Sequence, residues 1–293
     1  MAERIQKVLA RAGYGSRRGL EKMIKDGQIT VNGEQAKLGD KIAFGDTVRL
    51  EGGKPLSPKR LWQQPQQVML YNKPVGEVCT RNDPEGRRTM FQALPAPEEG
   101  RWVSVGRLDI NTSGLIILTT DGELANKLMH PSNEMDREYA VRVLGEVTSE
   151  MMQNLRDGVE LEDGKAHFSD IQEAGGEGAN HWYHVVIQEG RNRAVRRLWE
   201  SQGVQVSRLM RVRYGTVIIP KQLKMGKWMM LEGKDLERLY ESVDLQPNEV
   251  ENIGRAQREK KLRPIKMTKA PPARQKTDSK SYKGKRAPRI RGR

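Results

Sequence analysis

The spacing of apolar residues in the first fifty positions changes from the period of a helix to the period of a strand. In residues 5–12, apolar side chains recur every three or four positions, and Gly13 can end the helix that this spacing predicts. Ser16 is a good N-cap for a second helix. The pattern in residues 29–50 predicts short strands, the first of which ends in an Asn-Gly hairpin turn. Two helices packed on a small sheet are therefore expected.

The rest of the chain divides into a linker, a strand-rich domain and a tail. Residues 53–67 are rich in Pro and Gln, which predicts a linker between domains. Residues 68–245 contain mainly strand-like segments. Helical spacing interrupts them near residues 122–130, 149–157 and 195–202. Because strands and helices do not alternate regularly, an α+β domain with a largely antiparallel sheet is expected. Residues 246–293 have almost no periodic apolar positions, which predicts a disordered basic tail.

The chain carries a large excess of positive charge, and most of it lies in the predicted tail. Among the 293 residues, 52 are Lys or Arg and 38 are Asp or Glu, which gives a formal net charge of +14. Residues 246–293 hold 16 basic against 4 acidic residues, whereas residues 53–245 hold 26 against 27. This balance indicates a polyanionic partner, either a nucleic acid or an anionic membrane surface. The tail is predicted to add phosphate contacts that do not depend on sequence.

Several classes of protein are excluded by patterns that the sequence lacks. No run approaches the roughly 18 apolar residues of a membrane span, and a membrane-surface protein would need an apolar anchor, which is missing. Cys79 is the only cysteine, so no internal disulfide can form and a reducing, cytoplasmic location is expected. The four histidines form no metal pattern, and no phosphate-binding glycine loop is present. Neither a metal nor a nucleotide cofactor is therefore expected.

A pair of charged residues lies where a predicted strand gives way to a polar loop. Arg107 and Asp109 follow the alternating segment 101–105, and the turn sequence Asn-Thr-Ser-Gly comes shortly after them. Taken alone, Asp109 is typical of an Asx turn or a cap. Its possible chemistry depends on what the fold brings close to it.

Three later segments place polar side chains among apolar positions. They are residues 137–143, 189–198 and 206–215. The first alternates as a strand around Tyr139, the second carries four arginines from a glycine turn into a helix, and the third alternates basic and apolar residues. Each has an ordinary explanation, as a core aromatic residue or a solvated charged face. Together with Asp109, they predict one region of low polarity that holds a carboxylate, a phenol and several guanidinium groups.

The N-terminal residues resemble a known RNA-binding module. The stretch RIQKVLARAGYGSRRGLEKMIKDGQITVNG is similar to the S4 RNA-binding domain, which implies that residues 1–52 bind structured RNA. Arg17 and Arg18 lie at the start of the second predicted helix. Because a helix N-terminus carries partial positive charge and free N–H groups, the two arginines there indicate a site for phosphate.

Residues 1–245 as a whole resemble one family of enzymes. The stretches GRLDINTSGLIILTTDGELANKLMHPS, REYAVRV and EGRNRAVRRLWE are together similar to the pseudouridine synthases of the RsuA/RluB/RluE/RluF group. The S4-like module and the stretch YNKPVGEVCTRNDPEGRRTMF are most similar to the members that act on 23S ribosomal RNA. The resemblance implies an α+β protein, in which the small S4-like module precedes a larger, mostly antiparallel mixed-sheet catalytic domain.

The resemblance also implies catalytic residues. Asp109 matches the essential aspartate of the family, and Tyr139 matches the tyrosine that stacks on the target base. Arg196 matches the basic residue that pairs with the aspartate. Arg191 is a second choice for that position and is otherwise expected to bind the RNA substrate.

The implied reaction is the isomerisation of a uridine to pseudouridine in a stem-loop of 23S ribosomal RNA. In this reaction the N1–C1′ bond breaks and a C5–C1′ bond forms. Because it is an isomerisation, no redox cofactor or energy source is needed. The nucleotide must first leave its helix, which costs a few kcal/mol. Arg107 matches an arginine that holds the RNA around the extracted nucleotide, and Leu209 matches an apolar residue of the uracil pocket.

The alternative is a non-catalytic RNA-binding factor for ribosome assembly on the same fold. The S4-like module and the basic tail alone would fit such a factor. The complete set of Asp109, Tyr139 and Arg196 favours the enzyme, since an inactive relative would be free to lose it. The expected protein is a monomer that acts on ribosomal RNA, either free or within a pre-ribosomal particle, without a membrane.

Overall fold

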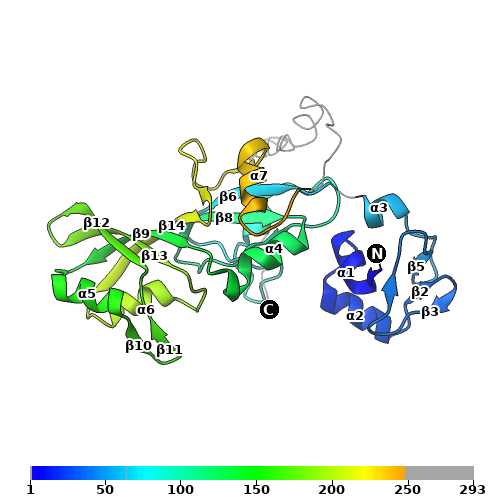
Figure 1. Cartoon of the computed structure of the whole chain (residues 1–293), viewed down its shortest axis with the longest axis horizontal. Helices are drawn as coiled ribbons and strands as arrows, with labels where there is room; N and C mark the ends of the chain where they lie inside the picture. The colour runs from blue at the N-terminus through cyan, green and yellow to red at the C-terminus, as the bar shows by residue number, and fades with distance from the viewer. Residues whose placement is uncertain (1, 64, 248–293) are drawn as a thin grey trace, which may run out of the picture. The chain divides into compact units, whose positions relative to one another are not determined.

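The computed structural model describes residues 2–63 and 65–247 of the chain (Figure 1). Its first part contains helices and short strands. They are β1 (Glu3–Arg4), α1 (Ile5–Arg11), α2 (Arg17–Lys25), β2 (Ile29–Val31), β3 (Glu34–Gln35), β4 (Lys41–Ile42), β5 (Val48–Leu50) and α3 (Pro58–Trp62). Strand β2 pairs antiparallel with β3 and β5, and β1 pairs with β4. The predicted tail lies outside the described residues from residue 248 onward.

The two helices predicted in this module are confirmed, and the local sequence explains their ends. The apolar face of α1 is fully buried in the core of the module. The Ser16 hydroxyl accepts a 3.0 Å hydrogen bond from the Gly19 N–H, so Ser16 is the N-cap of α2. Between β2 and β3, Asn32 and Gly33 both have positive φ, at 53° and 90°. The predicted two-residue turn requires this conformation.

The segment predicted to be a linker is partly folded. Helix α3 lies within residues 53–67 and begins at Pro58, a residue that the first turn of a helix tolerates well. Leu61 is buried in the N-terminal core, against which Leu56 and Trp62 also pack. Part of the predicted linker thus folds as a helix on the N-terminal core. A few apolar residues suffice for a short helix packed on a core, and a Pro- and Gln-rich composition hides them.

The second part is built on a nine-stranded sheet. Its strands are β6 (Val68–Lys73), β7 (Val103–Ser104), β8 (Ser113–Thr119), β9 (Arg137–Leu144), β12 (Asp170–Glu177), β13 (Asn180–Ile187), β14 (Gln205–Tyr214), β15 (Val217–Ile218) and β16 (Trp228–Met230). The main order is β12-β13-β9-β14-β8-β6-β16, while β15 pairs with β14 and β7 with β8. Among the described strands of this sheet, only the β14–β8 pair is parallel. The predicted α+β, mostly antiparallel architecture is confirmed.

Helices and one small hairpin accompany this sheet. They are η1 (Met90–Ala93), α4 (Gly122–Met129), η2 (Pro131–Asn133), α5 (Ser149–Asp157), the hairpin strands β10 (Val159–Leu161) and β11 (Gly164–Ala166), α6 (Ala194–Glu200) and α7 (Gly233–Glu241), where η marks a 3-10 helix. The three predicted helices correspond to α4, α5 and α6, whereas α7 was not predicted. The β10–β11 hairpin forms a two-stranded sheet of its own.

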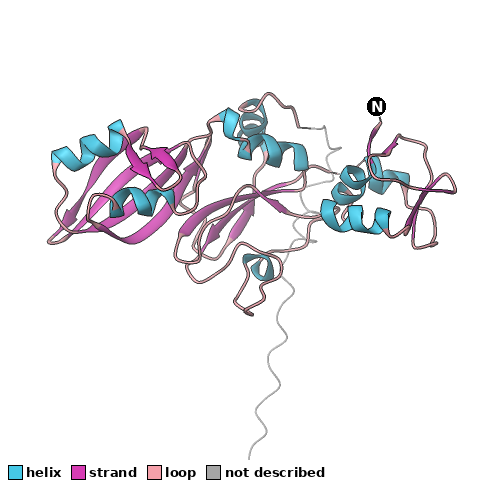
Figure 2. Ribbon diagram, turned by 90° about the horizontal axis from the view of Figure 1, so that it is seen from below, coloured by secondary structure: helices cyan, strands magenta, loops and turns pink. Residues whose placement is uncertain are grey.

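Both faces of the central strands are buried. Leu115 and Ile117 of β8 lie in one core with α4 and α7, whereas Ile116 and Leu118 lie in the other. This division follows from the two-residue period of a strand. Helices α5 and α6 contribute to the second core, and they lie against the long strands β9, β12, β13 and β14 at the left of Figure 2.

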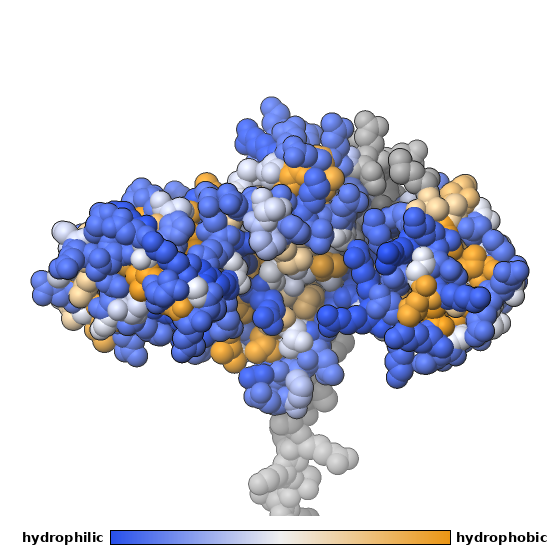
Figure 3. All heavy atoms as spheres, turned by 60° about the horizontal axis from the view of Figure 1, so that its bottom comes forward, coloured by the Kyte–Doolittle hydropathy of each residue, from blue (hydrophilic) through white to orange (hydrophobic). Residues whose placement is uncertain are grey.

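The face drawn in Figure 3 is mostly hydrophilic, with hydrophobic residues in small patches. Among the described residues, no helix has the length and apolar character that a membrane span requires.

The junction of β8 and β14 has a narrow steric requirement. The two strands are joined by only two residue pairs, Met210 with Ser113 and Arg211 with Gly114. Gly114 has φ +106°, and a Cβ atom on it would lie 2.3 Å from the Arg211 carbonyl oxygen. Only glycine permits this approach, because it lacks a Cβ atom. As a result, the loop before β8, which carries Asp109, lies beside the residues of β14 that include Leu209.

Candidate active site

The loop that carries Asp109 is fixed by a buried lysine. Lys73 lies at the end of β6 and is fully buried. Its ammonium group donates hydrogen bonds to the carbonyl oxygens of Pro74 (2.9 Å), Asp109 (3.1 Å) and Thr112 (2.9 Å). Burial lowers the pKa of Lys73, whereas nearby acidic groups, among them Asp109, raise it. Sequence reasoning did not find this residue, because its partners are main-chain atoms that no side-chain motif reveals.

A cavity of about 470 Å³ opens beside this loop and brings together segments that are far apart in the sequence. Five predicted site residues line it: Arg107, Asp109, Tyr139, Arg191 and Leu209. Tyr139 and Leu209 are buried on the neighbouring strands β9 and β14, while Asp109 is half-buried and Arg107 is exposed. The fold therefore places a carboxylate, a phenol ring and an apolar wall around one space.

Arg196 lies beside this cavity but does not pair with Asp109. Its guanidinium group is buried and donates to the carbonyl oxygens of Val206 and Asn111, both at 2.9 Å. Among the described residues, no cation forms an ion pair with the Asp109 carboxylate. Burial lowers the pKa of Arg196, as does Arg193, while Asp109 raises it. Arg196 thus connects β14 to the loop two residues beyond Asp109.

Two further arginines line the cavity, and the sequence analysis did not single them out. Arg137 and Arg211 each lie with the guanidinium carbon 5.1 Å from the centroid of the Tyr214 ring. Arg211 donates from Nε to the Leu115 carbonyl at 2.8 Å, while its Nη2 is buried without a hydrogen-bond partner. Arg137 donates to the Tyr214 hydroxyl at 3.3 Å and to the carbonyl of Met135 at 3.0 Å. For Arg211, the sequence signal was the alternation in residues 206–215, which places Leu209 and Arg211 on the same side of a strand.

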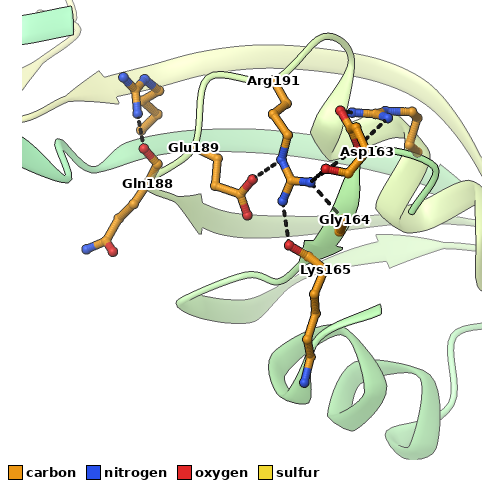
Figure 4. Close-up of polar contacts among 8 residues, drawn as sticks. Asp163, Gly164, Lys165, Gln188, Glu189 and Arg191 are labelled. Atoms are coloured by element: carbon orange, nitrogen blue, oxygen red, sulfur yellow. Dashed lines mark hydrogen bonds and ion pairs between the residues drawn. The ribbon is translucent and has the colours of Figure 1, made fainter. Parts of the chain in front are cut away.

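The remaining predicted residues have other surroundings. Arg191 lines the cavity, but its guanidinium group is bonded to Glu189 and to the turn at residues 163–165 (Figure 4). Arg17 and Arg18 are the first two residues of α2 and are both exposed. They belong to the N-terminal module and do not line the cavity.

Comparison with known proteins identifies the two parts of the chain. A family model described as RNA pseudouridylate synthase matches residues 67–201, and a model of the S4 domain matches residues 3–48. The ribosomal large subunit pseudouridine synthase B of Pseudomonas aeruginosa is 52% identical over 290 residues, which cover 99% of this chain and 74% of that relative. The chain belongs to the RNA pseudouridylate synthase family.

Other members of the family agree with this assignment. Proteins of the same name from Escherichia coli strain K12 and Vibrio cholerae serotype O1 are 54% and 56% identical. Each alignment covers 84% of this chain, with 85% of the first relative and 77% of the second. A crystal structure of a pseudouridylate synthase is 27% identical, with a TM-score of 0.56 over 80% of this chain and 99% of that one. The predicted fold, enzyme class and resemblance to RluB-type pseudouridine synthases are confirmed.

Proposed function

We propose that this chain isomerises a uridine of the large-subunit (23S) ribosomal RNA to pseudouridine. The observation that carries the proposal is the 470 Å³ cavity in which the Asp109 carboxylate and the Tyr139 ring face the same space as several arginines. The relatives named for the ribosomal large subunit support the choice of RNA.

The reaction needs a group that attacks or removes a proton, and Asp109 is suited to this task. The N1–C1′ bond breaks, a C5–C1′ bond forms, C5 loses a proton and N1 gains one. A carboxylate can act as a nucleophile at the base or the sugar, or as a base at C2′. Asp109 lines the cavity and forms no ion pair among the described residues, so no neighbouring cation competes with a bound nucleotide for its carboxylate.

The walls of the cavity fit a flipped uridine. The Tyr139 ring offers a stacking surface, and such stacking contributes roughly 1–3 kcal/mol per base. Leu209 supplies an apolar wall on the same strand as Arg211. Arg107 is exposed at the edge of the cavity, where it can bind phosphates or fill the space that the nucleotide leaves. Arg196 holds the loop beyond Asp109 and so keeps the carboxylate in place.

Recognition of the RNA as a whole falls to other parts of the chain. Arg17 and Arg18 of the S4 domain are proposed to contact phosphates of a stem-loop. The basic residues of 246–293 are proposed to add phosphate contacts without reading bases. The protein is proposed to act as a monomer in the cytoplasm, where bacterial ribosomal RNA is available to it, free or in a pre-ribosomal particle.

The experiment that tests this function is a map of pseudouridines in ribosomal RNA from cells with and without the gene. One uridine of the large-subunit RNA is expected to lose its modification when the gene is absent, and the purified protein should restore it in vitro. An unchanged map, together with delayed assembly of the large subunit, would instead favour the non-catalytic assembly factor, which no observation on the structure supports.

A further inference from the structure

A small hairpin is fastened to the wall of the cavity by arginine side chains. Strands β10 and β11 pair only with each other, and the tight turn between them contains Asp163. Figure 4 shows the Arg191 side chain extending from its own loop to this turn. Because no main-chain ladder joins the hairpin to the nine-stranded sheet, its position depends on the packing of Val159, Leu161 and Ala166 against the core and on polar side-chain contacts.

The donors of Arg191 are directed at acceptors within the protein. Nε donates to the Glu189 carboxylate in its own loop. Nη1 donates to the carbonyl oxygens of Asp163 (3.0 Å) and Gly164 (2.8 Å) and lies 3.2 Å from the Asp163 carboxylate. Nη2 donates to the Lys165 carbonyl. With Nε, Nη1 and Nη2 all engaged, Arg191 has little capacity left for a phosphate or for Asp109.

A second arginine completes the contact. Arg197 of α6 forms a bidentate pair with Asp163, with both N···O distances at 2.9 Å. The guanidinium of Arg197 is the main reason that the pKa of Asp163 lies below its usual range. Asp163 therefore stays ionised and joins the loop of Arg191 to the helix of Arg197.

The contacts of Asp163 with Arg191 and Arg197 fix residues that form part of the cavity wall. Residues 189–195 line the cavity, and Arg193 adopts φ 49°, which is unfavourable for a residue with a side chain. Immediately afterwards α6 begins, and its Arg196 reaches the Asn111 carbonyl beside Asp109. A loop with an unfavourable conformation keeps its shape only where its surroundings fix it.

We propose that Arg191 is a positioning residue: it locks residues 189–193 onto the turn at residues 163–165 and so places the pocket wall and Arg196 for the reaction. Asp163 is its partner in this lock. The proposal rests on the proposed isomerase function, and it differs from the expectation that Arg191 binds RNA directly. Glu189 and Asp163 offset the charge of Arg191, which also makes it a poor site for phosphate.

Three variants separate positioning from RNA binding. Arg191→Met removes the lock, Arg191→Lys keeps the charge without the planar fork, and Asp163→Asn removes a negative charge from the partner. If Arg191 bound a phosphate directly, lysine at this position would preserve part of the RNA binding. Removal of the Asp163 charge would then strengthen RNA binding. A lock predicts slower chemistry in all three variants at unchanged RNA affinity.

The experiment measures single-turnover pseudouridine formation at saturating large-subunit RNA, the Kd for that RNA and the melting temperature for each variant. Arg191→Met is expected to lower the rate by about 10²-fold, the cost of a misplacement near 1 Å, with Kd within about twofold of the parent. Arg191→Lys and Asp163→Asn are expected to lower it by at least about tenfold. Because Asp163 also pairs with Arg197, the double variant Arg191→Met/Asp163→Asn should be at least as slow as Arg191→Met alone.

The matched control is Glu160→Gln, an exposed acidic residue of the same hairpin outside the lock, which should react like the parent. A raised Kd with a normal saturated rate in Arg191→Met, rescued by lysine, would overturn the proposal in favour of direct RNA binding. Normal rates in Arg191→Lys and Asp163→Asn would also overturn it, even if Arg191→Met does not fold. Inactivity of the parent protein on this RNA would instead refute the proposed function.

Discussion

Arg17 and Arg18 of the N-terminal module stand exposed at the first turn of α2, whereas Arg137, Arg196 and Arg211 are buried around the cavity. Each of the buried arginines donates to at least one main-chain carbonyl oxygen. An exposed guanidinium offers charge that salt screens, while a buried one is held in place and shielded from ions. The same side chain can thus supply affinity in one region and geometry in another.

The largest expected effect is on turnover, and it follows from a substitution of Asp109 in the cavity. Asp109→Asn keeps the size of the side chain but removes its charge and its nucleophilicity. Turnover is expected to fall by about 10⁴-fold or more, as it does when a reacting group is removed. RNA affinity should stay near normal, because most phosphate contacts lie elsewhere. The measurements are pseudouridine formation and RNA binding by the purified variant.

Asp235→Asn, on the exposed side of α7, serves as the control for loss of a carboxylate. Measurable turnover by a pure Asp109→Asn protein would contradict the assignment of Asp109.

The next effect concerns stability. Lys73→Met leaves the carbonyl oxygens of Pro74, Asp109 and Thr112 without their buried donor. A loss of about 3 kcal/mol in the free energy of unfolding is expected, because unsatisfied buried acceptors keep their full desolvation cost. Urea unfolding measures it, with the exposed Lys224→Met as control. Equal midpoints for the two variants would show that Lys73 does not hold the loop.

A smaller effect is expected from changes to the exposed arginines of α2. The double variant Arg17→Ala/Arg18→Ala should weaken RNA binding by roughly tenfold at low salt and reduce the log–log salt slope by about 0.7–0.9 for each phosphate that is no longer bound. The saturated rate should not change, since neither residue lines the cavity. Titrations at several salt concentrations test this. A changed choice of uridine would show that these arginines do more than bind phosphate.

The smallest expected effect is a pH dependence of stability. The pKa of Asp163 is lowered in the folded protein, chiefly by Arg197. The ionised side chain therefore stabilises the fold above the unfolded pKa of about 3.9, and this contribution is lost as pH falls through the lower, folded value. Urea unfolding at neutral pH and near pH 3 should show a smaller acid-induced loss for Asp163→Asn than for Glu160→Gln. Parallel losses would indicate that the Asp163–Arg197 pair has no net effect on stability.

Local sequence was sufficient to predict some parts of this molecule. The cap at Ser16 and the Asn-Gly turn between β2 and β3 depend on neighbouring residues, so their chemistry is visible in the sequence. The segments that line the cavity were also visible, through the resemblance and through strand alternation. Helix α7 was missed although Leu236, Leu239 and Tyr240 have helical spacing, because the segment begins with a glycine and is highly charged.

Other features depend on contacts between distant residues, which no local period encodes. The pairing of β8 with β14 brings Gly114 next to Arg211, and nothing near either residue specifies the partner. The same holds for Arg191, whose main-chain acceptors at residues 163–165 lie 26 to 28 positions earlier in the chain. The direction of an arginine side chain decides whether it binds a substrate or the protein itself. A sequence motif gives the position of the arginine in the chain but not this direction.

The two residue pairs that join β8 to β14 have a consequence for motion, since eight pairs join β14 to β9. A junction crossed by few main-chain bonds is expected to open more readily than one crossed by many, so the amide hydrogens that bond across the β8–β14 junction should exchange with solvent earlier than those between β14 and β9. Such an opening would separate Asp109 from Leu209 while the remaining strands stayed folded. The side-chain bonds from Arg211 to Leu115 and from Arg196 to Asn111 cross the same junction. These two arginines therefore oppose such an opening, and their loss is expected to shorten the time for which the pocket stays assembled.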